Sequence, residues 1–196
     1  MRPTKIANEM GYPVILFLDA KTNSLVEEFS TSNFSALIKS KNGESYPYTY
    51  VTPKSRSILP SITNRSLLEL AFSLGWKVER RKVEWEEIKN NAFDEVVACG
   101  TAVVIVPIYQ IDIQIPVLDR KEVITGSDPP ENVKMGDSFW DFDEPQTEFL
   151  YESHVIGDGI NYPGFRELFD LYRAIQNGNS PDSFEWMCPK DGIDLS

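Results

Sequence analysis

The sequence predicts an α+β domain with a mostly antiparallel sheet against which two helices pack. In the first 51 residues, short apolar runs are separated by turn residues, which is typical of a strand meander. Segments 63–74 and 164–176 instead carry apolar side chains at helical spacing. Strands and helices do not alternate, as they would in a parallel sheet with crossover helices.

Composition limits the class of protein. The chain has 196 residues, 41% of them hydrophobic, which is enough for one sizeable core, so we expect a single domain over 1–196. A net charge of -11 argues against nucleic acid or an anionic membrane as partner. The apolar runs are too short to cross a bilayer, and no secretory signal is recognisable. With only two cysteines, we expect a cytoplasmic chain, or a mitochondrial matrix one if an N-terminal segment is missing.

The first part of the chain contains one helix end and several strands. Residues 3–10 predict the last turns of a helix, which Gly11 closes. A buried strand is expected at 13–18, followed by a polar turn at 19–24. Further strands are expected at 26–29, 34–39 and 46–51, with a hairpin turn at Asn42-Gly43 before the last of them.

The helix expected at 63–74 has the best-defined start in the chain. Pro60 fixes one backbone angle, Ser61 or Thr63 can cap the helix, and Gly75 supplies the left-handed residue that ends it. A helix start presents unpaired N–H groups and the positive end of the helix dipole. It therefore favours an anion such as phosphate, although most such starts only cap themselves.

The second half continues with strands and ends on a helix. We expect a strand at 77–83, a short helix at 85–90, two strands within 95–108 split at Gly100-Thr101, and a helix at 164–176 that stops at Asn177-Gly178. Residues 109–155 are less regular and are interpreted as an insertion. Cys99 is expected to be a buried structural cysteine, and His154 a surface residue.

Three segments in order carry a resemblance to a known family: VEEFSTSN at 26–33, LPSIT at 59–63 and CGTA at 99–102. Together they resemble the C-terminal large domain of branched-chain amino acid aminotransferases, which are class IV, fold-type IV pyridoxal phosphate enzymes. The resemblance covers most of the chain outside about 109–155. It implies a curled sheet, a pseudo-barrel, and a cofactor-binding large domain alone.

The resemblance also implies a cofactor site. Glu28, with Asn33 five positions later, matches the pair that binds the protonated pyridine nitrogen of pyridoxal 5'-phosphate. A carboxylate there keeps the ring cationic, so that it accepts electrons from a substrate carbanion. Leu59 by resemblance packs on the ring, and Ile62 and Thr63 bind the phosphate.

The turn after the strand at 95–100 completes the implied site. By the same resemblance Thr101 supplies another phosphate contact, and Thr101 and Ala102 lie where the substrate carboxylate is held. An ordinary strand-to-strand turn is the alternative. No metal site is expected, and no catalytic residue is assigned within the chain.

The chain departs from the family pattern at its start. The family's Schiff-base lysine, in a segment ending Gly-Asn-Tyr-Ala, lies farther upstream of the acidic residue than the 27 residues that precede Glu28. That lysine and the N-terminal small domain are therefore expected to be absent, and Lys5 is interpreted as structural. Ser61 stands where a glycine is common, and Asn64 where an arginine often follows.

Two functional hypotheses remain open from the sequence. In one, the chain is a truncated aminotransferase for leucine, isoleucine and valine with 2-oxoglutarate, which binds pyridoxal phosphate weakly and without turnover. In the other, it is a degenerate, non-catalytic binding domain. D-amino acid aminotransferases and aminodeoxychorismate lyase share the fold and are further alternatives. Family members are homodimers, so the chain is expected to self-associate.

Overall fold

The computed structural model describes residues 2–41, 43–116 and 149–187. The chain divides into two compact units, one formed by Met1–Ile111 with His154–Ser196 and the other by Asp112–Ser153. Two strands, β8 (Gln110–Pro116) and β9 (Phe149–Val155), form a separate two-stranded sheet. The single domain with an insertion at about 109–155 stays a prediction.

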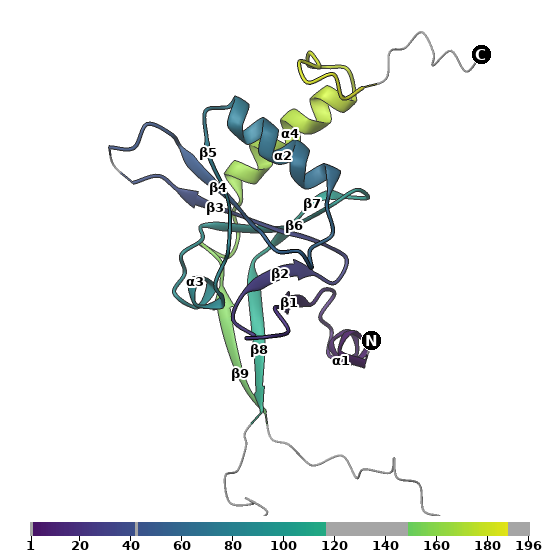
Figure 1. Ribbon diagram of the computed structural model, residues 1–196, viewed down its shortest axis with the longest axis vertical. Helices are drawn as coiled ribbons and strands as arrows, with labels where there is room; N and C mark the ends of the chain where they lie inside the picture. Colours follow the sequence, from purple (N-terminus) through teal and green to yellow (C-terminus); the bar gives the residue numbers. More distant parts are fainter. Residues whose placement is uncertain (1, 42, 117–148, 188–196) are drawn as a thin grey trace, which may run out of the picture. The chain divides into compact units, whose positions relative to one another are not determined.

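The first unit is built on a seven-stranded sheet (Figure 1). Its strands are β1 (Leu16–Leu18), β2 (Val26–Phe29), β3 (Ser32–Lys39), β4 (Tyr48–Pro53), β5 (Lys77–Arg81), β6 (Glu95–Gly100) and β7 (Val104–Ile108). Its helices are α1 (Arg2–Glu9), α2 (Ile62–Ser73), α3 (Trp85–Lys89) and α4 (Pro163–Gln176). The strand pairs of this sheet are antiparallel except β4–β5, which confirms the expected α+β class. The curling of the sheet into a pseudo-barrel stays a prediction.

Most expected elements lie within a few residues of the observed ones, but the first strand differs. The strand expected at 13–18 is only three residues long in the structure, and Phe17 in its middle is exposed. Its pairing with β2 contains a register shift, which interrupts the ladder and limits the strand's length. The turn expected at Asn42-Gly43 includes Asn42, which lies outside the described residues.

Strand β3 is the centre of the sheet because it pairs with three others. Residues 33–37 pair with β6, so β6 occupies one edge of β3. The other edge is shared in succession by β2, which pairs at 32–33, and β4, which pairs at 36–39. The start of β3 therefore lies between the end of β2 and the end of β6.

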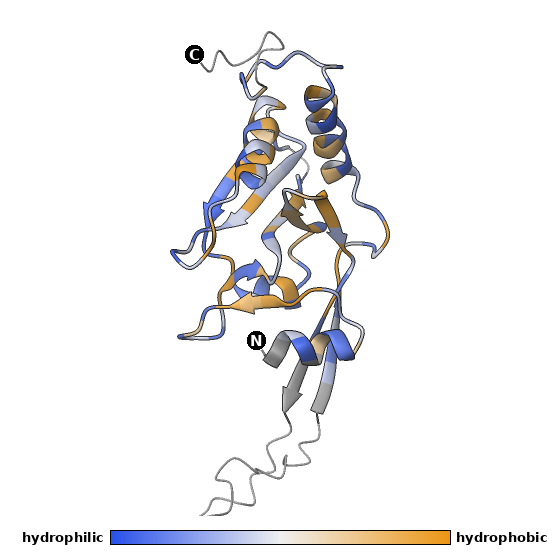
Figure 2. Cartoon of the chain, turned by 90° about the vertical axis from the view of Figure 1, so that its right-hand side faces the viewer, coloured by the Kyte–Doolittle hydropathy of each residue, from blue (hydrophilic) through white to orange (hydrophobic). Residues whose placement is uncertain are grey.

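Side chains of β3 alternate between two cores. Leu37 belongs to a cluster with Leu67 and Leu70 of α2 and Phe165 of α4, whereas Phe34 and Ala36 belong to a second cluster that includes Ile88 of α3. Successive residues of a strand face opposite sides of the sheet, so β3 is covered on both faces. Figure 2 shows apolar and polar residues along the helices that cover the sheet.

Helix α2 begins and ends as the sequence predicts. Ser61 is its N-cap, and its hydroxyl accepts a hydrogen bond from the Asn64 N–H at 3.1 Å. Gly75 follows the helix in the left-handed region, with φ +77°. Both signals are local to the helix ends, which is why the sequence alone carries them.

Helix α4 is capped by another element of the chain. Its N-cap residue, Tyr162, makes no side-chain cap bond, and Pro163 has no N–H to be satisfied. The next two N–H groups, of Gly164 and Phe165, each donate at 2.9 Å to the carboxylate of Glu95 on β6. One buried carboxylate therefore anchors the start of α4 to the centre of the sheet.

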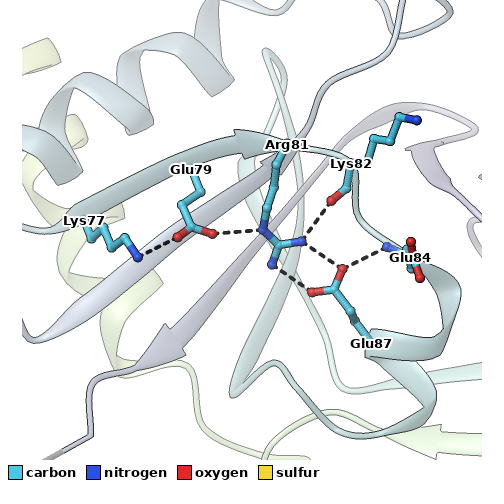
Figure 3. A network of polar contacts seen from close by, with 6 residues as sticks. All are labelled: Lys77, Glu79, Arg81, Lys82, Glu84 and Glu87. Carbon is cyan, nitrogen blue, oxygen red and sulfur yellow. Dashed lines mark hydrogen bonds and ion pairs between the residues drawn. The ribbon is translucent and has the colours of Figure 1, made fainter.

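An ionic network joins β5 to α3 (Figure 3). The Arg81 guanidinium contacts both carboxylate oxygens of Glu87 at 2.8 Å and also pairs with Glu79, which in turn pairs with Lys77. Glu87 accepts the Glu84 N–H, so the same carboxylate completes the capping box of α3. The network adds polar contacts to a short helix whose Ile88 and Trp85 also pack in the second core cluster.

Candidate cofactor site

The site predicted from the sequence begins as a row of side chains across three strands. Glu28 of β2 pairs with Asn33 of β3, and Asn33 pairs with Cys99 of β6. Directly paired residues in antiparallel strands present their side chains on the same face of the sheet. Asn33 is two residues from Ser35, which hydrogen-bonds to Asn64 of α2, so this row lies on the α2 face.

Hydrogen bonds tie the loop before α2 to this row. The Leu59 N–H donates to Glu28 Oε2 at 3.2 Å, and the Asn33 side-chain amide donates both to Glu28 Oε2 at 3.2 Å and to the Leu59 carbonyl at 2.9 Å. Asn33 is buried, and its amide holds the carboxylate and the loop together. The spacing of Glu28 and Asn33 thus has a structural cause: the two residues face one another across a tight β2–β3 turn.

The carboxylate of Glu28 keeps capacity for a further partner. Within the described residues, both of its recorded hydrogen bonds use Oε2, which leaves Oε1 for a donor outside the chain. A carboxylate held in this way suits a cationic N–H group, since a charge-assisted bond is about twice as strong as a neutral one.

The start of α2 lies three residues beyond Leu59. As the first two helical residues, Ile62 and Thr63 have N–H groups without an intrahelical acceptor. The side chains of Leu59 and Ile62 are 73% and 82% exposed, whereas Thr63 is buried. Two exposed apolar residues therefore lie close in sequence to two N–H groups that have no acceptor within the helix, at the positive end of its dipole.

Thr101 and Ala102 lie in the turn between β6 and β7, and both are exposed. A Cβ at the preceding Gly100 would lie 3.6 Å from the Ser32 Cβ, so this turn begins beside the start of β3. Val104 closes the turn with φ +67°, and the Ile105 N–H donates to the Val103 carbonyl at 2.8 Å. A β-branched residue in this conformation is strained, and the surrounding sheet holds the turn in one shape.

The structure brings some of the predicted residues together and leaves others apart. Hydrogen bonds join Glu28, Asn33 and Leu59. Ile62 and Thr63 follow Leu59 closely in sequence, as the first two residues of α2. Among the described residues, no recorded hydrogen bond links Thr101 or Ala102 to that group, although the β3–β6 register puts their turn at the same end of β3.

Sequence reasoning missed a buried polar cluster beneath α2. Ser35, Tyr50, Thr52 and Asn64 are connected by hydrogen bonds of 2.8–3.2 Å between three elements. In the sequence, Asn64 stands out only as a departure from the family pattern. A tyrosine and an asparagine separated by fourteen residues carry no local signal of this contact.

Two other expectations have clear outcomes. Burial raises the pKa of the Cys99 thiol to about 11, so the thiol is neutral at pH 7 and the cysteine is structural, as expected. The expectation that His154 is a surface residue is wrong. It is 8% exposed and packs edge-on against Trp85, with ring centroids 5.4 Å apart. Its position inside a segment without clear periodicity concealed this.

Comparison with known proteins identifies the family. The family model described as amino-transferase class IV matches residues 4–111, which is more than half of the chain. The chain belongs to the class IV aminotransferase family. The matched range includes every residue of the candidate site.

Several relatives share this sequence pattern. Aminotransferase atnJ of Emericella nidulans is 42% identical over 105 residues, 54% of this chain and 30% of the relative. The branched-chain-amino-acid aminotransferase of Helicobacter pylori is 42% identical over 108 residues, 55% of this chain and 29% of the relative. A probable branched-chain-amino-acid aminotransferase of Staphylococcus epidermidis is 31% identical over 186 residues, 92% of this chain and 39% of the relative. The chain thus matches well under half the length of these relatives.

Solved structures agree on the fold. The branched-chain amino acid aminotransferase of Escherichia coli superposes with a TM-score of 0.59 at 21% identity, covering 93% of this chain and 44% of that one. The T.th. branched-chain amino acid aminotransferase, complexed with N-(5'-phosphopyridoxyl)-L-glutamate, gives 0.61 at 20% identity, covering 94% and 44%. In the described part of the chain, no helix combines the length and apolar character needed to span a membrane.

The donor set of the site fits the cofactor of this family. Pyridoxal phosphate has three parts to be bound: a ring nitrogen that a carboxylate can hold protonated, the apolar face of the ring, and a phosphate dianion. Glu28, the exposed Leu59 and the Ile62 and Thr63 N–H groups, which have no acceptor within the helix, offer a partner for each of these parts.

Proposed function

We propose that this chain carries the cofactor-binding face of a pyridoxal 5'-phosphate-dependent branched-chain amino acid aminotransferase. The observation that carries the proposal is the Glu28 carboxylate, clamped by Asn33 and the Leu59 N–H next to the start of α2. The proposed substrates are leucine, isoleucine or valine, with 2-oxoglutarate. The names of the relatives and the amino-acid sequences of segments 29–33 and 98–102 support them.

Each residue of the site has a distinct role in this proposal. Glu28 holds the ring nitrogen protonated, with Asn33 orienting the carboxylate, and Leu59 packs on the ring. The N–H groups of Ile62 and Thr63, with Thr101, bind the phosphate, and the turn at Thr101 and Ala102 holds the substrate carboxylate. When bound, the cofactor supplies an electron sink for a carbanion formed on the substrate.

Proton transfer at the substrate carbon needs a base that these residues do not supply. Of the two lysines that precede Glu28, Lys5 is on α1, is 80% exposed and pairs with Glu9, and Lys21 is exposed in a polar turn. We therefore propose that the polypeptide of residues 1–196 binds the cofactor without a covalent link and works as a large domain. We further propose a pseudo-barrel sheet and homodimeric association, as the family suggests, and a cytoplasmic location, as the composition suggests.

The proposal predicts weak cofactor binding without turnover. Polypeptide 1–196 should bind pyridoxal phosphate with micromolar affinity or weaker, and should form no 2-oxo acid from leucine, isoleucine or valine. Glu28→Gln should weaken binding about 10-fold, because it removes one charge-assisted bond. Equilibrium titration followed by absorbance measures both affinities, and borohydride treatment with peptide mapping detects a covalent adduct.

The matched control is Glu27→Gln. Glu27 neighbours Glu28 on β2 but accepts from Ser55 at 2.8 Å, so this change should leave the affinity within about 2-fold of the unchanged chain. A trapped adduct on Lys5 together with turnover would contradict the non-covalent proposal. Absence of any cofactor retention would instead favour a degenerate binding domain.

A further inference from the structure

The buried polar cluster beneath α2 has a defined set of hydrogen bonds, and we call it the Asn64 network. Tyr50 Oη lies 2.8 Å from Asn64 Oδ1, and Ser35 Oγ lies 3.2 Å from the same atom. On its other side, Asn64 Nδ2 donates to Thr52 Oγ1 at 2.9 Å. Ser35 and Tyr50 are fully buried, and Thr52 is 2% exposed.

The direction of these bonds is fixed by their ends. The Thr52 hydroxyl donates to the Phe34 carbonyl at 3.2 Å, and a carbonyl only accepts. Thr52 Oγ1 must therefore accept from Asn64, which turns the amide nitrogen toward Thr52 and the amide oxygen toward Tyr50 and Ser35. That oxygen has two lone pairs, so it can accept from both hydroxyls. An asparagine at 64 thus matches both sides of the network.

The network contacts the first turn of α2, which has no buried apolar side chain. The first buried apolar side chain of the helix is Leu67, more than a turn after its start. Ile62 is 82% exposed, and Thr63, Asn64 and Arg65 are polar. The side chain of Asn64 is the recorded hydrogen-bond link, within the described residues, between this first turn and strands β3 and β4.

From this arrangement we infer that the Asn64 network sets the position of the Ile62 and Thr63 N–H groups, and thereby determines how tightly the site holds a phosphate monoester. The inference rests on the proposed function, and it makes Asn64, Tyr50 and Thr52 positioning residues. Because the network acts on the phosphate end alone, it should not affect binding of the ring.

Two near-isosteric variants test the network from opposite sides of Asn64. Tyr50→Phe keeps the core ring and removes the hydroxyl, and Thr52→Val removes the acceptor of the amide. The probes are pyridoxine 5'-phosphate and pyridoxine, which differ only in the phosphate and form no Schiff base with lysines. Calorimetric titration of each variant should show about 5- to 10-fold weaker binding of the phosphorylated probe and a change below about 2-fold for pyridoxine, as expected when hydrogen bonds to one anion weaken.

Tyr46→Phe is the matched control, because the Tyr46 hydroxyl donates to the exposed Glu44 at 2.9 Å, on a loop away from α2. It should leave both affinities unchanged. A second readout needs no ligand. The N–H groups of Asn64 and Arg65 bond to Ser61, and their hydrogen exchange should be faster in Tyr50→Phe and Thr52→Val than in the unchanged chain and in Tyr46→Phe.

The outcomes separate this inference from the proposed function. If the unchanged chain binds both probes equally, the phosphate site itself is wrong, and the inference is wrong with it. If the unchanged chain prefers the phosphorylated probe but the variants weaken both probes equally, or neither, the proposed function stands and the positioning role is overturned. A selective loss of phosphate-dependent affinity with faster exchange supports it.

Discussion

Gly157→Ala should destabilise the first unit by about 3 kcal/mol or more, because two penalties add. Gly157 has φ +55°, a region that residues with a side chain rarely adopt, and a Cβ there would overlap the backbone carbonyl oxygen of Asp94. A backbone atom cannot rotate away as a side chain can. The segment between His154 and α4 would have to move from the strand that carries Glu95.

Urea unfolding followed by circular dichroism measures this effect. The control is Gly178→Ala, since Gly178 has φ +70° but no atom within 4 Å of the position that a Cβ would take. It should lose only about 1 kcal/mol, the conformational part of the penalty. Equal losses in the two variants would show that the Asp94 contact does not constrain the fold.

Glu95→Ala should cost about 3–5 kcal/mol, since it leaves two buried N–H groups without an acceptor. The carboxylate is 3% exposed and accepts from the Gly164 and Phe165 N–H groups at 2.9 Å each. Glu95→Gln keeps one acceptor and turns a donor toward the other N–H, so we expect an intermediate loss. Glu86→Gln is the control: its ion pair with Lys89 is exposed and should contribute less than about 0.5 kcal/mol.

The Glu95 variants also predict a pH dependence. Burial raises the pKa of the Glu95 carboxyl above its usual value, although the two N–H bonds partly oppose this. A raised pKa means that the folded state binds the proton more tightly than the unfolded state. Stability from this group is therefore full below the unfolded pKa and decreases as pH rises through the folded one.

The difference in unfolding free energy between the unchanged chain and Glu95→Gln isolates this contribution from the other carboxyl groups. It should be largest below the ordinary glutamate pKa and should shrink as the pH rises toward neutrality. Urea titrations at several pH values measure it. A difference that grows with pH would mean that the two N–H bonds, rather than burial, dominate the carboxyl pKa.

Local signals explain which parts of the fold were predictable. The ends of α2 follow from Ser61 and Gly75, and the break between β6 and β7 follows from Gly100. Pairing partners are not local, so the parallel β4–β5 pair and the sharing of one edge of β3 could not be read from the chain. The same holds for Glu95. Its carboxylate caps α4, which begins at Pro163, 68 positions later in the sequence.

The candidate site divides in the same way. Glu28, Asn33 and Leu59 were all predicted from the family resemblance. The structure explains the five-residue spacing of the first two, because they pair across one tight turn and are in direct contact. The contact of Asn33 with Leu59 joins residues 26 positions apart, so no local pattern indicates it. The Asn64 network went unnoticed because its members are ordinary polar residues on three elements.

In the proposed function, Glu28, Leu59 and the start of α2 together hold pyridoxal phosphate. Amide hydrogen exchange by mass spectrometry, on polypeptide 1–196 with and without the cofactor, tests it most directly. We predict slower exchange on binding at residues 59–65 and 100–103, with no change in α4 at residues 166–176. Protection confined to other segments, or the same protection with pyridoxine alone and none added by the phosphate, would contradict the account.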